Sequence, residues 1–128
     1  MRSTWLLGAT VAAVIGAGSA TLAAHHSRTG FDPNDKPVEL KGIVAEYRWR
    51  NPHVLFFWDV KDENGKVVRW VTEFGSVATT IGRGLTKDTF KPGEAVTVVG
   101  IRSQAGTPVL LLQRVIKADG TVIGGDAE

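Results

Sequence analysis

The 128-residue sequence contains no cysteine, which excludes disulfide bonds and thiolate metal ligands. It also lacks the signatures of common enzyme classes. No serine stands in the context of a nucleophile elbow, and Gly82-Arg83-Gly84 is too short to be a phosphate-binding loop. The formal net charge is only +2, so neither nucleic acid nor another polyanion is expected as a partner. These absences favour a non-catalytic protein. If the protein were an enzyme, its turnover should depend on His53 or Glu73.

Residues 1–24 are typical of a secretory signal peptide and are expected to form a signal helix before the domain. Arg2 precedes an apolar run from Trp5 to Ile15, and small residues follow up to Ala23 and Ala24. No lipoprotein cysteine and no twin-arginine pair is present, so we expect Sec export to the periplasm, with cleavage after Ala23 or Ala24. The alternative is a retained membrane anchor, because the segment is about as long as a membrane span requires.

The remaining chain predicts one small domain. Residues 25–37 are expected to form an extended arm, 38–123 the folded domain and 124–128 a disordered tail. Ser76 is expected to cap a short helix that ends at Gly82 and Gly84. Alternating apolar residues and turn signals predict strands at Val38–Trp49, His53–Lys61, Lys66–Phe74, Ala95–Ile101, Val109–Lys117 and Thr121–Ile123.

This order of elements predicts an all-β fold. A short helix between the third and fourth strands is the arrangement of a five-to-six-stranded OB-like barrel, and a β-sandwich fragment is the alternative. Asn64-Gly65 predicts a two-residue hairpin loop with Glu63 opposite Lys66, so that His53 lies opposite Ser76. The residues expected on the same face as His53 are Leu55, Phe57, Trp70, Thr72 and Phe74.

Several motifs resemble those of a family of small exported bacterial proteins, classified as a domain of unknown function. The motifs are His25-His26-Ser27, Phe31-Asp32, Asn51-Pro52-His53, Asp59 to Gly65, Trp70, Glu73, Gly75-Ser76, Lys91 to Glu94 and Ala118-Asp119-Gly120. The resemblance covers essentially the whole chain after residue 24, and it implies an exported β-barrel-like domain with no assigned activity. The chain departs from the family pattern at Arg28 and at Gly82-Arg83-Gly84-Leu85.

All three histidines fall in two short segments, and this placement predicts a copper site. Cleavage after Ala23 would give Ala24-His25-His26, whose amine, two amides and third-position imidazole form a square-planar set suited to Cu(II). Cleavage after Ala24 would instead give an N-terminal His25 that chelates one metal ion, with His53 completing the set. Asp32 is the nearest candidate carboxylate, and Glu73 is another. The alternative is a solvated arm and a strand-end His53 bonded to the backbone.

A second hypothesis is ligand binding on the face of the second and third strands. OB barrels use this face and the adjoining loops, where aromatic and arginine side chains stack on ligands. A small ligand or a periplasmic protein would be the partner. The alternative is that these side chains only fill the barrel. The candidate residues are Trp49, Arg50, Asn51, Phe57, Trp70 and Glu73.

Overall fold

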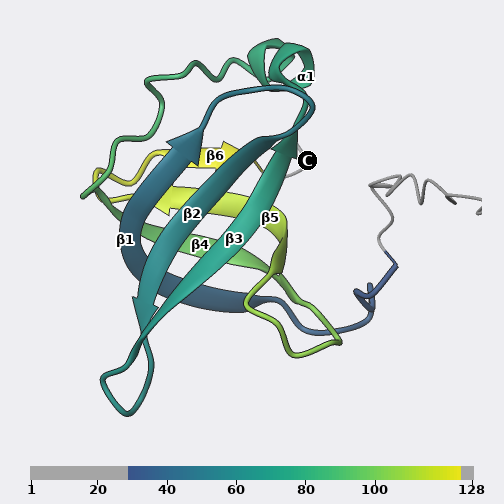
Figure 1. The fold of residues 1–128 in the computed structure, drawn as a ribbon, viewed down its shortest axis with the longest axis vertical. Coiled ribbons are helices and arrows are strands. Elements are labelled where there is room, and N and C mark those ends of the chain that lie inside the picture. Colours follow the sequence, from purple (N-terminus) through teal and green to yellow (C-terminus); the bar gives the residue numbers. More distant parts are fainter. Residues whose placement is uncertain (1–28, 125–128) are drawn as a thin grey trace, which may run out of the picture.

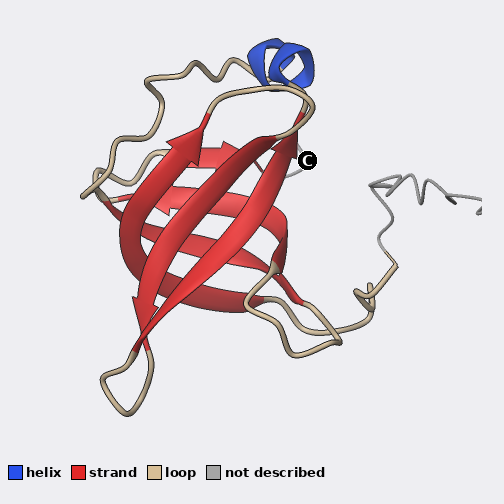
Figure 2. Ribbon diagram, viewed as in Figure 1, coloured by secondary structure: helices blue, strands red, loops and turns tan. Residues whose placement is uncertain are grey.

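The computed structural model describes residues 29–124, and its central element is the long strand β1 (Val38–Arg48). The first half of β1 pairs with β4 and the second half pairs with β2, both antiparallel. The full sheet order is β3-β2-β1-β4-β5-β6, and the sheet curls around one interior (Figures 1 and 2). The other elements are β2 (Val54–Lys61), β3 (Val67–Gly75), α1 (Val77–Gly82), β4 (Ala95–Arg102), β5 (Leu110–Lys117) and β6 (Val122–Gly124).

The curled sheet meets itself between β3 and β5. A parallel bridge joins Val71 to Val109, and the Val71 amide donates a hydrogen bond to the Pro108 carbonyl at 3.1 Å. The buried hydroxyl of Thr72 donates to the Leu110 carbonyl at 2.9 Å, which satisfies a polar group inside the barrel. The contact between β3 and β5 is confined to the region of this bridge, so the strands form a half-open barrel. The predicted OB-like, all-β fold with a short helix after the third strand is confirmed. The predicted signal peptide, with its helix, lies outside the described residues.

A bend in β1 lets this strand serve both of its neighbours. The pairing with β2 shifts between Val44 and Glu46, which makes Ala45 the extra residue of a β-bulge. Gly42 allows a close approach instead, because a Cβ there would collide with the Asp59 carbonyl oxygen and with the Trp58 ring. The bulge therefore lies three residues after this close approach.

Aromatic side chains fill the interior of the barrel. Phe56 and Trp58 are fully buried and their rings stack with centroids 5.7 Å apart. Phe90, from the connection between α1 and β4, packs against Phe56 with a centroid distance of 4.7 Å. Such rings bury more apolar area than any other side chains, so they dominate the energetics of a small core. The buried cluster consists of Val44, Val54, Phe56, Trp58, Trp70, Phe74, Leu85, Phe90, Val96, Val98, Leu110 and Val115.

The β2–β3 hairpin differs from its predicted register by one residue. The Asp62 amide donates to the Lys66 carbonyl at 2.8 Å, and Gly65 has a φ of 79°, so the loop has three residues rather than two. The paired residues therefore run from Lys61 opposite Val67 to Leu55 opposite Glu73. A one-residue shift reverses the faces of a strand. The prediction that Leu55 and Phe57 share a face with Trp70, Thr72 and Phe74 was wrong.

The other predicted strands are found with each end moved by no more than one residue. The Ser76 hydroxyl accepts a hydrogen bond from the Thr79 amide at 3.1 Å, so the predicted cap of α1 is confirmed. Gly124 belongs to β6 rather than to the tail. The described part of the arm is turned rather than extended, because the Asp32 carboxylate accepts from the Asn34 amide at 2.8 Å. Between residues 29 and 124, no helix combines the length and apolarity needed to cross a membrane.

Candidate functional site

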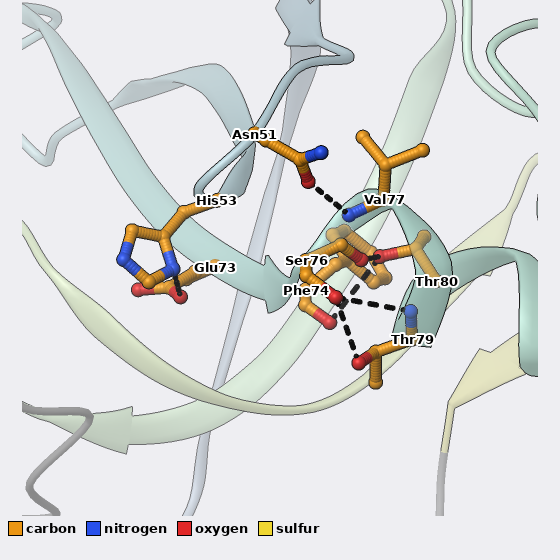
Figure 3. Close-up of polar contacts among 8 residues, drawn as sticks. All are labelled: Asn51, His53, Glu73, Phe74, Ser76, Val77, Thr79 and Thr80. Carbon is orange, nitrogen blue, oxygen red and sulfur yellow. Dashed lines mark hydrogen bonds and ion pairs between the residues drawn. The ribbon is translucent and has the colours of Figure 1, made fainter.

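The loop between β1 and β2 is attached to the start of α1. The Asn51 side-chain oxygen accepts a hydrogen bond from the Val77 amide at 3.0 Å, across 26 residues of sequence (Figure 3). The same loop contains the cis Asn51–Pro52 peptide bond. Ser76 caps α1 directly beside this contact, so the cap and the loop are parts of one polar network. The network defines where the chain enters β2 and therefore where His53 lies.

His53 lies next to Glu73 at this end of the hairpin. The Nδ1 atom of His53 is 2.5 Å from a carboxylate oxygen of Glu73 (Figure 3). Leu55 of β2 pairs with Glu73 of β3, so His53, two residues before Leu55, is a diagonal neighbour of Glu73. The side chains are 20% and 36% exposed, so the pair is half-sheltered but accessible to solutes. An imidazole held at Nδ1 presents Nε2 in a fixed direction.

The outer face of the sheet carries polar pairs around one aromatic ring. The Arg48 guanidinium lies over the Phe57 ring, 4.7 Å from its centroid, and donates two hydrogen bonds to Glu46 at 2.7 and 2.9 Å. Arg69 donates to Asp59 at 2.8 and 2.9 Å in the same bidentate manner. The hydrogen bonds from these arginines hold the pKa values of Glu46 and Asp59 below their usual range. The arginines are therefore already paired within the described chain.

The residues predicted to bind a ligand are divided between the two sides of the barrel. Phe57 and Glu73 face outward, and Arg50 and Asn51 are exposed in the β1–β2 loop. Trp70 points into the core and is 8% exposed, although Arg102 covers one side of its ring at 5.0 Å.

Trp49 is half-buried against Tyr47, with their ring centroids 5.7 Å apart. The predicted aromatic ligand face is therefore reduced to Phe57 and the exposed part of Trp49.

Tyr47 is a buried polar group that the sequence analysis did not identify. Its ring packs edge-on against Phe90 and Phe74, with centroids 5.2 and 6.0 Å away. The hydroxyl is buried and has no hydrogen-bond partner among residues 29–124. Burial raises the pKa of Tyr47 to about 12. The position of Tyr47 next to Trp49 connects the core to the β1–β2 loop.

The predicted metal ligands are not gathered by the described part of the chain. His25 and His26 lie outside the described residues. Asp32 organises the turn before β1, and this turn contacts the β4–β5 loop because the Gln104 amide donates to the Gly30 carbonyl at 2.8 Å. Residues 29–124 hold no group of three or more His, Cys, Asp or Glu side chains arranged for a metal ion. Of the predicted set, the structure brings together His53 and Glu73.

Sequence reasoning missed the pairing of Glu46 with Arg48 and the contact of Asn51 with α1. The first has a recognisable signal, because opposite charges two residues apart on a strand share a face. The second has none, since Asn51 and Val77 are adjacent only after the hairpin and α1 have folded.

Comparison with known proteins gives a family and no activity. The model of a family of unknown function, DUF6152, matches residues 12–111, which is most of the chain. No curated protein and no solved structure matches the chain.

Proposed function

The chain belongs to the DUF6152 family, and we propose that it is an exported, non-catalytic periplasmic protein that binds Cu(II) through His53. The observation that carries this proposal is the His53–Glu73 pair. Metal-binding histidines usually have one ring nitrogen held by a carboxylate or carbonyl, so that the other nitrogen is oriented for coordination. Imidazole is a preferred ligand of Cu(II), and no thiol is available to favour Cu(I).

Glu73 has the role of an orienting residue rather than a metal ligand. Its carboxylate is next to Nδ1 of His53, and Nε2 lies on the opposite side of the ring (Figure 3). A proton on Nδ1 directed at the carboxylate leaves the Nε2 lone pair as the donor to the metal.

His25 and His26 are the proposed source of further nitrogen ligands. The mature chain would begin with Ala24 or His25, and either start places an amine and imidazoles close together in sequence. Mass spectrometry of the protein purified from the periplasm tests this step. A chain that begins at Ala24 or His25 is expected, whereas a retained residue 1 or a cytoplasmic location would contradict the export proposal.

Calorimetric titration of the processed protein with Cu(II) tests the role of His53. Replacement of His53 by alanine is expected to weaken binding at least tenfold, because the oriented imidazole is lost. The Glu73→Gln variant keeps the shape but loses the charge, and we expect a loss of about 10-fold to 100-fold, as for other residues that orient a ligand.

The matched control for Glu73→Gln is Asp59→Asn. This residue is also an outward-facing carboxylate on the hairpin, but its partner is Arg69 instead of a histidine. The Asp59→Asn variant should bind Cu(II) with the same affinity as the unaltered chain. Equal affinities for the His53→Ala variant and the unaltered chain would contradict the proposal.

The second candidate is a metal-free barrel that binds a small ligand or a periplasmic protein on its outer face. The observation in its favour is Phe57, an aromatic ring that is half-exposed between two arginine–carboxylate pairs. In that case Phe57→Ala would reduce binding of the partner while the three histidines would be dispensable. Trp70 belongs to the core, so its removal would test stability rather than binding.

A further inference from the structure

A groove of about 640 Å³ separates β6 from the connection that follows α1. Arg83, Leu85 and Asp88 line one side, and Val122 and Ile123 line the other. The residues that line the groove include neither His53 nor Glu73. Its strand-side wall is the last strand of the sheet order, whose neighbour is β5.

The outer edge of β6 has backbone groups suited to another strand. The Lys117 amide donates to the Thr121 carbonyl at 2.9 Å, so Thr121 bonds toward β5. Alternate residues of an antiparallel strand bond to opposite sides. Val122 therefore directs its amide and carbonyl away from β5, and its side chain is 56% exposed. β6 contains neither lysine nor proline, which commonly block the pairing of edge strands.

The groove carries two unpaired side chains of opposite charge, and this favours a copy of the same surface. A third charged residue in its lining, Lys117, is already paired with Glu94 at 3.6 Å. Arg83 and Asp88 are exposed and carry opposite charges on the same wall, and neither forms an ion pair with another residue in 29–124. A two-fold axis beside β6 would place Arg83 near Asp88 of the partner subunit, and the reverse. Antiparallel pairing of a strand with its own copy has the same two-fold symmetry.

We propose that the β6 edge and this groove form the interface of a homodimer in which β6 pairs antiparallel with β6 of a second copy. The two sheets then become continuous across the interface. A three-residue strand offers few hydrogen bonds, so the dimer is weak and depends on concentration.

Sedimentation equilibrium of the chain with residues 125–128 retained tests the proposal over a range of micromolar concentrations. The mass of the unaltered chain is expected to rise toward twice the monomer mass. Val122→Lys should raise the dissociation constant at least tenfold, because a charge then lies at the centre of the interface. The matched control is Val67→Lys, which alters an equally exposed valine at the start of β3 and should leave dimerisation unchanged.

A charge reversal adds a readout that does not depend on β6. Arg83→Asp should weaken the dimer, and the double variant with Asp88→Arg should restore it, because the pair across the two-fold axis is exchanged. A chain that stays monomeric, or a Val122→Lys variant that dimerises normally, would overturn the proposal. A dimer that forms only after removal of residues 125–128 would also overturn it, since the C-terminal segment would then be the occupant of the groove.

Discussion

The inner and outer faces of the β2–β3 hairpin differ in both chemistry and consequence. The inner face presents Phe56, Trp58 and Trp70 to the buried core cluster. The outer face carries the polar pairs His53–Glu73 and Asp59–Arg69, which are in contact with solvent. Adjacent residues of a single strand therefore have different roles. Alternate side chains are buried and stabilise the barrel, and the side chains between them are accessible from solvent.

Removal of Trp58 should have the largest effect on the inner face. The side chain is fully buried and stacks on Phe56, so Trp58→Ala leaves a large cavity. We expect the free energy of unfolding to fall by about 3–5 kcal/mol. Urea denaturation measures this change, and a loss below about 1 kcal/mol would show that the core is not organised around this ring.

Gly42→Ala tests the close approach of β1 and β2, and it should have the next largest effect. The added methyl group collides with the Asp59 carbonyl, so a loss of about 1–3 kcal/mol is expected from strand displacement. Gly82→Ala is the matched control, because nothing lies within 4 Å of a Cβ at that position. Equal stabilities for the two variants in the same urea titration would contradict the close approach of β1 to β2 at Gly42.

Tyr47 gives the core a distinctive dependence on pH. The pKa is about 12 in the folded chain and about 10 in an exposed tyrosine. Between these values the unfolded chain has lost the phenol proton and the folded chain has kept it, so stability falls as the pH rises through this window. The Tyr47→Phe variant should not show this decrease in stability between pH about 10 and about 12. Denaturation midpoints below and above the window measure it, and identical slopes for both chains would contradict the burial of the hydroxyl.

Phe57→Ala on the outer face should have the smallest effect on stability. The ring is half-exposed and contacts Arg48, so we expect a loss of about 1 kcal/mol or less. The same urea titration compares this variant with Trp58→Ala, its neighbour in sequence. A loss equal to that of Trp58→Ala would remove the distinction between the two faces.

The sequence was sufficient to predict the order of the elements and the cap at Ser76, because alternation and capping are local signals. It did not determine which face of the hairpin is buried. Phe56, Phe57 and Trp58 are all apolar, so the pattern has no period of two, and the predicted register depended on the loop at Asn64-Gly65. That loop has three residues, and the faces were exchanged as a result.

The sequence indicated individual residues of the candidate site but not which of them are in contact. His53 and Glu73 were both candidates, and their contact depends on the register that pairs Leu55 with Glu73, which follows from a loop of three residues instead of the predicted two. Asp32 was chosen for its proximity in sequence to His25 and His26, and in the structure it organises a turn. The contact between His53 and Glu73 thus follows from strand register, which local patterns did not determine.

The most direct test of copper binding by His53 is pulsed electron paramagnetic resonance of the Cu(II)-loaded processed protein. The method detects the remote nitrogen of a copper-bound imidazole. In the His25→Ala/His26→Ala double variant, we expect an imidazole signal that disappears when His53 is also replaced by alanine. A double variant without any imidazole signal would contradict the central claim that His53, held by Glu73, is a copper ligand.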